Sequence, residues 1–312
     1  MKIAYYEEND YHTEILGTFL TKFDNCEITV YNTHDKSEWI QYYKNIWGFD
    51  LKPAETLIDN YKLYDKIIIG TSISTELFLD KLDKNKLLDK LLYVCHLKEN
   101  LNNEIQDKTI VLTPLNKTPN NYCILPINNL YNDVFPKKDN IIGIIGRFKN
   151  NNRDSNELVN LIENYKCHNF SFYLFSRHIK FVPRQLIELQ KKYPNHIKIF
   201  LKVKTKELVE YFKVIKYLCP LNDDNSIYCK DRLTGIIPLS YNFNIPLLIN
   251  KKLANIYNIQ SGFIYEKSII EIFENIIAID DQLYLDKIKC LLEEKKNIIK
   301  KNNEQLFNLY NP

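Results

Sequence analysis

The chain has 312 residues, 45% of them hydrophobic, so it is long enough for two ordinary domains or one large one with a sizeable core. Its 42 basic and 39 acidic residues leave a formal net charge of only +3, which argues against a protein whose main work is binding the nucleic-acid backbone. No apolar run approaches the ~20 residues of a transmembrane helix.

The first half of the chain alternates short apolar runs with amphipathic stretches. The opening run, KIAYY, predicts a strand, and apolar side chains follow it at helical spacing: Ile15, Leu16, Phe19, Leu20 and Phe23. Four later runs also have the character of strands: EITVY, KIIIG, LLYVC and TIVLT. Strands that alternate with helices predict a parallel sheet covered on both faces.

The pattern breaks between Pro114 and Pro136, a segment rich in proline and asparagine that is typical of turns and linkers. A second β/α series follows, with strands predicted at IIGIIG, FSFYLF, IKIFL, KYLCP and PLLIN. Helices are predicted around Leu158–Tyr165, Leu208–Ile215, Thr234–Asn242 and Gln282–Leu309. We therefore predict an α/β fold with two Rossmann-like domains, residues 1–137 and 138–282, and a C-terminal helix, residues 283–312. Two such domains facing each other would form a ligand cleft.

Seven cysteines are scattered along the chain without a CxxC pair, an odd number that favours buried, reduced thiols in a cytosolic protein. Their spacing with histidine does not fit a zinc site. The opening MKIAYYEEND lacks the apolar stretch of a signal peptide, so we expect a cytoplasmic protein. The abundance of Lys, Asn, Ile and Tyr indicates an AT-rich genome, such as that of a large DNA virus or a protozoan.

The segment IIGIIGRFKNNNRD places three cations just after a predicted buried strand. Gly146 ends the strand, and Arg147, Lys149 and Arg153 follow before the next helix. Helix N-termini favour anions, and arginine offers bidentate geometry to phosphate oxygens. The segment suits a diphosphate. The alternative is a solvated loop that is basic because lysine is abundant throughout the chain.

A second polar turn precedes the strand PLLIN. Asp231 and Arg232 lie in a loop, and Thr234, Gly235 and Ile236 open an apolar helix. Glycine at a helix N-terminus lets a phosphate or ribose approach the backbone closely. An ordinary helix cap in front of a core helix is the competing interpretation.

The order of these segments resembles the C-terminal domain of retaining GT-B glycosyltransferases, the glycogen-synthase-like group. The matching segments are the GR turn with its basic loop, ELVEYFKVIKYLCP, and GIIPLSYNFNIPLLINKKLANIY. The resemblance covers residues 140–265, whereas the N-terminal half shares only the β/α order. It implies a GT-B fold in which the last helix crosses back onto the N-terminal domain.

The resemblance also implies a donor site for a nucleotide-sugar. Arg147 and Arg153, with Lys149 as a third candidate, would bind the diphosphate, and the helix that begins near Gly235 would cradle the phosphates and ribose. Ser176 and Arg177 follow the strand FSFYLF and are further candidate contacts, as are Asp231, Arg232, Thr234 and Ile236. Cations would take the place of a metal, so neither a metal ion nor a cofactor is expected.

Two features depart from the family's pattern. The family carries two glutamates eight positions apart, which here correspond to Asp231 and Leu239, and the glycine-rich loop after the first strand is replaced by EENDYHTE. The loss of the second carboxylate keeps open a non-catalytic scaffold that binds sugar or protein.

Histidine titrates near neutral pH and therefore suits a catalytic base. His12, beside Asp10 in the loop after the first strand, and His96, directly after LLYVC, are the candidates. For His12 the alternative is a surface side chain, and for His96 a hydrogen-bonded structural one.

The leading hypothesis is an enzyme that transfers a sugar from a nucleotide-sugar to a glycan, protein or lipid acceptor, with retention of configuration implied by the resemblance. A nucleotide-sugar 2-epimerase shares the architecture and would need no acceptor. A DNA-modifying glucosyltransferase gains no support from the nearly balanced charge.

Overall fold

We describe the chain from a computed structural model. The description covers residues 1–7, 13–23, 25–33, 37–70, 90–96, 107–131, 140–148, 153–165 and 170–310. The chain divides into two compact units: Met1–Leu130 together with Ile299–Pro312, and Tyr131–Ile298. Sequence composition places the boundary slightly later, at residue 138, because the stretch rich in proline and asparagine ends there.

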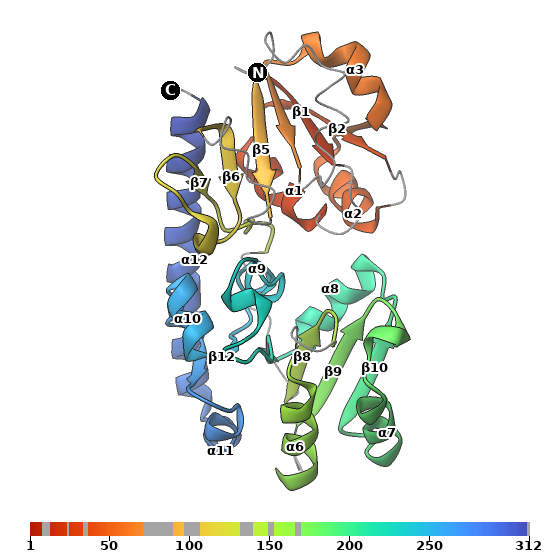
Figure 1. The fold of residues 1–312 in the computed structure, drawn as a ribbon, viewed down its shortest axis with the longest axis vertical. Helices are drawn as coiled ribbons and strands as arrows, with labels where there is room; N and C mark the ends of the chain where they lie inside the picture. Colours follow the sequence, from red (N-terminus) through yellow and green to blue (C-terminus); the bar gives the residue numbers. More distant parts are fainter. Residues whose placement is uncertain are drawn as a thin grey trace. The chain divides into compact units, whose positions relative to one another are not determined.

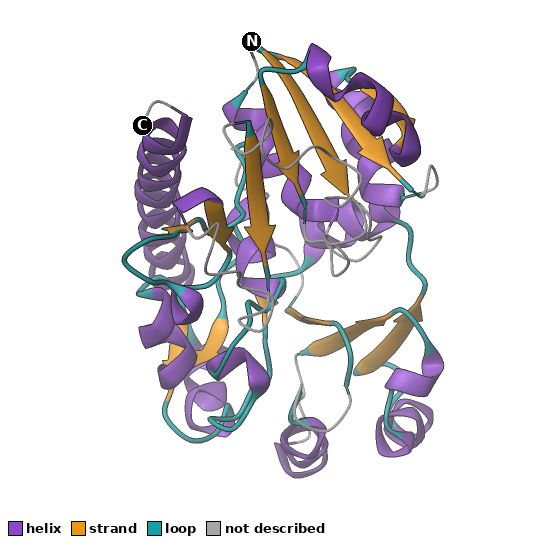
Figure 2. Ribbon diagram, turned by 45° about the horizontal axis from the view of Figure 1, so that its top comes forward, coloured by secondary structure: helices purple, strands orange, loops and turns teal. Residues whose placement is uncertain are grey.

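The first unit is built on a seven-stranded parallel sheet, seen as a fan of arrows in Figures 1 and 2. Its strands are β1 (Lys2–Glu7), β2 (Glu27–Asn32), β3 (Asp50–Pro53), β4 (Lys66–Ile69), β5 (Leu91–Cys95), β6 (Thr109–Val111) and β7 (Tyr122–Cys123). The strand order is β3-β2-β1-β4-β5-β6-β7. Chain order reverses between β1 and β4, and sheets of this kind bind ligands at the carboxyl ends of such a pair.

Helices α1 (Leu16–Lys22), α2 (Glu38–Trp47) and α3 (Leu57–Asn60) also belong to this unit. The predicted apolar stripe packs inward: Phe19 of α1 lies 5.6 Å from the ring of Tyr5 on β1, centroid to centroid. Sequence patterning misses the edge strands β3 and β7. Both are short and have no fully buried residue, so they lack the apolar run that marks the inner strands.

The second unit contains a four-stranded parallel sheet and a two-stranded one. The larger sheet has the order β10-β9-β8-β11, from β8 (Ile141–Ile145), β9 (Ser171–Ser176), β10 (Ile197–Leu201) and β11 (Tyr217–Leu218). The smaller pairs β12 (Leu248–Asn250) with β13 (Phe263–Tyr265). An isolated bridge between Leu218 and Leu247 links β11 to the residue before β12.

Seven α-helices are described in this part of the chain: α6 (Ser155–Tyr165), α7 (Arg184–Lys192), α8 (Thr205–Val214), α9 (Ile236–Phe243), α10 (Lys251–Tyr257), α11 (Ile270–Ala278) and α12 (Asp281–Tyr310). Rings carry the packing between sheet and helix. Phe273 of α11 lies 6.3 Å from Phe172 of β9 and 5.3 Å from Phe170, and all three are buried. The predicted helix at Thr234–Asn242 begins two positions later, at Ile236, because Gly235 is its N-cap.

Helix α12 passes from the second unit into the first, as the resemblance implies. Near its end, the Asn302 amide donates to the carbonyl of Leu125 (2.7 Å), and Gln305 Oε1 accepts from the N–H of Cys123 (2.7 Å). The predicted α/β fold class, with a C-terminal helix that returns to the N-terminal unit, is confirmed.

Within the second unit, α12 is fixed by the carboxylate of Glu294. Its two oxygens accept from the N–H groups of Gln260 (2.6 Å) and Ser261 (3.0 Å), from the Ser261 hydroxyl (2.6 Å) and from the Tyr241 hydroxyl (3.0 Å). Burial raises the pKa of Tyr241, and the charge of the Glu294 carboxylate raises it further. One side chain therefore joins α9, α12 and the loop before β13.

We expect Glu294→Gln to lower the free energy of unfolding by about 2 kcal/mol, because the amide keeps one acceptor oxygen and turns an N–H donor toward other donors. Urea unfolding followed by circular dichroism measures the change. The matched control is Glu293→Gln, an exposed neighbour on the same helix. Equal stability of the two variants would contradict this role for Glu294.

Six of the seven cysteines lie in the described residues, and all six are free thiols, whereas Cys167 lies outside them. Burial raises the pKa of Cys219 to about 12 and of Cys123 to about 11, so both stay protonated at neutral pH. In the part of the chain that the structure describes, the helices are all too short or too polar to span a bilayer.

Candidate functional site

The carboxyl end of β8 makes a sharp turn that depends on Gly146. Gly146 has φ +125°, a conformation that glycine adopts readily and other residues rarely do. Its N–H donates to the carbonyl of Phe175, at the end of β9 (3.0 Å). An added Cβ would lie 3.3 Å from Nη2 of Arg153. The glycine therefore allows the turn and leaves room for that arginine.

Arg147 is exposed at this edge of the sheet and rests on an aromatic ring. Its guanidinium carbon lies 4.7 Å from the ring centroid of Phe181. The next residue, Phe148, is wholly buried, and its N–H donates to the carbonyl of Phe181 (3.0 Å). The ring and the backbone bond hold Arg147 at the end of β8 with its charge accessible.

Arg153, in contrast, is buried, with 6% of its surface exposed. Its Nη2 donates to the carbonyl of Ile145 (2.8 Å) and to the hydroxyl of Thr234 (3.2 Å), and Nη1 lies 3.4 Å from Oδ1 of Asn222. The guanidinium carbon lies 5.0 Å from the ring centroid of Tyr228. Burial lowers the pKa of Arg153 from its ordinary range. One cation thus ties the end of β8 to the loop before α9.

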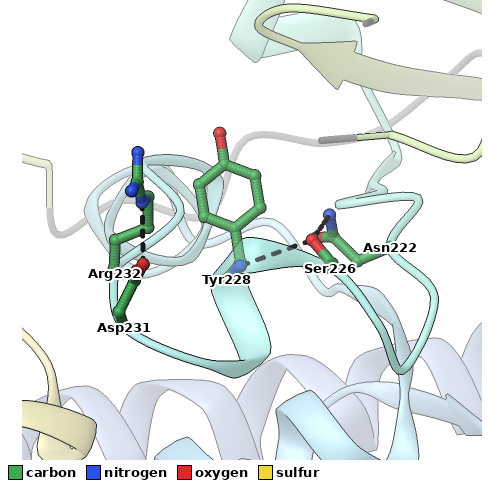
Figure 3. Close-up of polar contacts among 5 residues, drawn as sticks. All are labelled: Asn222, Ser226, Tyr228, Asp231 and Arg232. Carbon is green, nitrogen blue, oxygen red and sulfur yellow. Dashed lines mark hydrogen bonds and ion pairs between the residues drawn. The ribbon is translucent and has the colours of Figure 1, made fainter. Parts of the chain in front are cut away.

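That loop is organised around Ser226 (Figure 3). The amide of Asn222 donates to the Ser226 hydroxyl (3.0 Å), which also accepts from the N–H of Tyr228 (3.4 Å). The Asn250 amide donates to the carbonyl of Asn222 (3.0 Å). Figure 3 shows the ring of Tyr228 and the guanidinium of Arg232 pointing to the same side of the loop. The loop therefore presents an aromatic ring and a cation together.

The predicted residues Asp231 to Ile236 lie where α9 begins. Arg232 Nε donates to Oδ1 of Asp231 (2.8 Å), and both side chains remain partly exposed. Thr234 is wholly buried, whereas Gly235 is exposed and caps the helix. The first N–H groups of a helix have no intrahelical acceptor. At the start of α9, the N–H of Ile237 donates to the Thr234 carbonyl, and Pro238 has no N–H. The N–H groups of Gly235 and Ile236 are therefore the ones at this end of the helix that a ligand could use.

Ser176 and Arg177 follow β9 at the same edge. The Ser176 side chain is buried, and its hydroxyl donates to the carbonyl of His178 (3.2 Å). Arg177 is exposed. The structure thus brings Arg147, Arg153, Ser176, Arg177, Thr234, Gly235 and Ile236 to one edge of the second unit, with Asp231 and Arg232 in the adjoining loop. Lys149 lies outside the described residues.

Of the predicted catalytic residues, His96 follows β5 directly and is partly buried, at the carboxyl edge of the first unit's sheet. Asp10 and His12 lie outside the described residues. The structure adds Glu7, which ends β1 at the switch point and is wholly buried. The Glu7 carbonyl accepts from the Asn32 amide (2.6 Å), and the carboxylate lies where a side chain on Gly70 would be.

Sequence reasoning missed Asn222, Tyr228 and Phe181, which complete the surroundings of the two arginines. An aromatic ring five residues past the end of β9 could have been noticed for Phe181, but nothing local marks Asn222 as a partner of Arg153. Among the described residues, no group of three or more His, Cys, Asp or Glu side chains is arranged to hold a metal ion.

Comparison with known proteins shows similarity in structure only. No family model matches the sequence, and no curated protein matches it. The solved structure of Anabaena Alr3699/HepE in complex with UDP and glucose aligns with a TM-score of 0.69 and 10% identity over 100% of both chains. A glycosyltransferase from Rickettsia africae gives a TM-score of 0.62 and 12% identity over 99% of this chain and 98% of that one. AviGT4, a glycosyltransferase of avilamycin A biosynthesis, gives 0.63 and 9% over the same shares. The chain has the GT-B fold of these enzymes.

Proposed function

We propose that this chain of GT-B fold is a glycosyltransferase that takes its sugar from a nucleoside-diphosphate donor bound at the carboxyl edge of the second unit. The observation that carries the proposal is the bond from Arg153 to Thr234, which links the turn after β8 to the start of α9. A cation and a helix N-terminus on neighbouring segments suit a diphosphate. HepE is similar in fold over its full length and was solved with UDP-glucose.

The chemistry of sugar transfer requires the leaving diphosphate to be stabilised as charge develops on it. In this proposal Arg147 supplies an accessible cation, and the N–H groups of Gly235 and Ile236 bind phosphate oxygens. Arg153, which is buried, positions the turn after β8 and the start of α9. Ser176, Arg177 and Lys149 are further donor contacts, and no metal is required because cations neutralise the charge.

Sugar and acceptor selection form the finer part of the proposal. Asp231 accepts hydrogen bonds from donor hydroxyls, with Arg232 holding its carboxylate, and Tyr228 offers a ring at the same side of the loop. His96, His12 or Asp10 acts on the acceptor hydroxyl of a glycan, protein or lipid. The sugar is a hexose or a related unit, transferred with retention of configuration.

A non-catalytic sugar- or protein-binding scaffold is the second candidate, and Leu239 favours it. This residue stands where the family has its second glutamate, and it is buried, with 8% of its surface exposed. A nucleotide-sugar 2-epimerase remains a third. Acceptor-free release of an epimerised sugar would identify the epimerase, and nucleotide binding without turnover would identify the scaffold.

We expect one nucleotide among UDP, GDP, CMP and their common sugar conjugates to raise the melting temperature, since a ligand that binds only the folded state stabilises it by mass action. Arg147→Ala should lower the affinity for that nucleotide at least about tenfold, because an accessible cation next to the phosphates is lost. Thermal shift measured over a concentration series gives the affinities.

The matched control is Arg184→Ala, which removes an exposed arginine at the start of α7, paired there with Glu188 at 2.7 Å. The control should bind the nucleotide as the wild type does. If no nucleotide shifts the melting temperature at millimolar concentration, the donor site is refuted.

A further inference from the structure

Positive charge at the carboxyl edge of the second unit extends well beyond Arg147. Arg177, His178 and Lys180 follow β9, and Lys202 follows β10. Because β8, β9 and β10 are parallel neighbours, the residues after them gather at one edge. We call Arg177, His178, Lys180 and Lys202 the β9–β10 cation group.

The ring of Phe181 contacts two members of this group, His178 and Lys180, and also Arg147. Arg147 lies 4.7 Å and Lys180 Nζ 5.4 Å from its centroid, and the His178 ring lies 5.6 Å away. Two cations and an imidazole therefore share one aromatic ring, and cation–π contacts of this kind fix charged side chains in place. The ring therefore restrains the charges of Arg147 and Lys180 next to the His178 imidazole.

Lys202 enters the group from an unfavourable backbone conformation. Its φ is +52°, in the left-handed region where glycine or asparagine is favoured, and its N–H donates to the carbonyl of Ser176 (3.1 Å). A side chain that keeps such a conformation often has a functional role. Here the strained position adds a cation next to His178.

Two lysines of the group, and Arg147 beside it, are not balanced by acids. Within the described residues, Arg147, Lys180 and Lys202 form no ion pair with a carboxylate. Burial lowers the pKa of His178, and the charges of Lys202, Lys180, Arg177 and Arg147 lower it further. Four cations acting on one imidazole leave a positive site that an anion would relieve.

We propose that the β9–β10 cation group, together with Arg147, binds a phosphate group other than the donor's diphosphate. The proposal deepens the proposed function, because Arg147 and Arg177 would be shared by both phosphate sites. A nucleoside-diphosphate sugar carries about two negative charges, which the helix N-terminus, Arg147 and Arg153 already match. Three further basic groups, His178, Lys180 and Lys202, therefore suit a second phosphate, carried by a soluble ester or by a lipid.

The first experiment measures binding of inorganic pyrophosphate by thermal shift and calorimetry. We expect the double variant Lys180→Gln/Lys202→Gln to bind pyrophosphate at least about tenfold more weakly than the wild type, because two nearby cations are lost. Gly235→Val, which obstructs the start of α9, should leave this site intact. The matched control, Lys191→Gln/Lys206→Gln, removes two exposed lysines elsewhere in the second unit and should bind as the wild type does.

Nucleotide binding should show the opposite pattern. Gly235→Val should lose nucleotide binding, whereas the nucleotide affinity of Lys180→Gln/Lys202→Gln should stay within about threefold of the wild type. If no nucleotide binds but the pyrophosphate pattern holds, the donor site fails and the second phosphate site stands. If pyrophosphate does not bind, or if the Lys180/Lys202 variant equals its control, the second site is refuted. Binding to phosphatidylcholine vesicles with and without phosphatidic acid tests a lipid as the source of the phosphate. A lipid source is identified if the protein binds only the vesicles that contain phosphatidic acid and if this binding is lost in Lys180→Gln/Lys202→Gln.

Sulfate provides a pH test, because it keeps its charge between pH 5.5 and pH 8. An anion in the site should raise the pKa of His178 from its lowered value, so binding takes up a proton and tightens as pH falls. We expect the wild type to gain more affinity from pH 8 to pH 5.5 than His178→Gln does. Equal pH dependence in both proteins would overturn the role of His178.

Discussion

Replacing Arg153 with alanine is expected to lower the free energy of unfolding by about 3 kcal/mol. The side chain is buried and donates to the Ile145 carbonyl, the Thr234 hydroxyl and Asn222 Oδ1. Alanine leaves these acceptors unsatisfied in a dry environment and opens a cavity under the Tyr228 ring. The recovered desolvation energy of the cation offsets only part of that loss.

Arg147→Ala is the matched control, because it removes the same side chain from the same turn at an exposed position. It should cost no more than about 1 kcal/mol, the value of one exposed cation–π contact. Urea unfolding must be followed by circular dichroism, since Trp39 and Trp47 both lie in the first unit and their fluorescence does not report on the second. Equal stability of the two variants would mean that Arg153 is not a structural cation.

The two variants also separate positioning from binding. Arg147→Ala should bind nucleotide weakly while folding normally, whereas Arg153→Ala should show both defects. Arg153→Lys keeps the charge but not the fork of donors, so it should recover only part of the stability.

The stability of the protein should depend on pH through Lys295. This lysine is buried on α12, and its ammonium donates to the carbonyl of Tyr131 (2.7 Å) and to Asn244 Oδ1 (3.2 Å). Burial lowers the pKa of Lys295 to about 8. In the unfolded chain a lysine titrates near 10.4. Between these values the unfolded state binds more protons, so this group makes stability rise with pH.

The expected gain is about 2 to 3 kcal/mol between pH 8 and pH 10, at about 1.4 kcal/mol for each pH unit. Buried tyrosines titrate in the alkaline range as well, so the quantity to measure is the difference in unfolding free energy between wild type and Lys295→Met at each pH. That difference should increase with pH in favour of the wild type.

Lys287 provides the control for this measurement. It lies on the same helix and also donates to two carbonyls, those of Gln260 and Gly262 (both 3.0 Å), but at a more accessible position. Lys287→Met should change stability by a similar amount at pH 8 and at pH 10. If the difference in unfolding free energy between wild type and Lys295→Met also stays constant from pH 8 to pH 10, burial does not lower the pKa of Lys295.

The amino-acid sequence by itself determined the inner strands and the amphipathic helices of both units. Runs such as KIIIG and FSFYLF are apolar because both faces of a parallel strand are buried, and this information is local. The turn at Gly146 and Arg147 was also visible, since a glycine followed by cations at a strand end is a local feature. The start of α9 was visible to within two residues, at Thr234 in the prediction and at Ile236 in the structure.

Only the tertiary structure decided which of these residues lie together and which of them are buried. Arg147 and Arg153 look alike in the sequence, yet one is exposed on Phe181 and the other is buried against Thr234 and Asn222. Lys202 joins His178 through strand pairing, and β3 and β7 exist because neighbouring strands offer them hydrogen bonds. Burial and pairing between residues far apart in the chain arise from packing, which local periodicity does not encode.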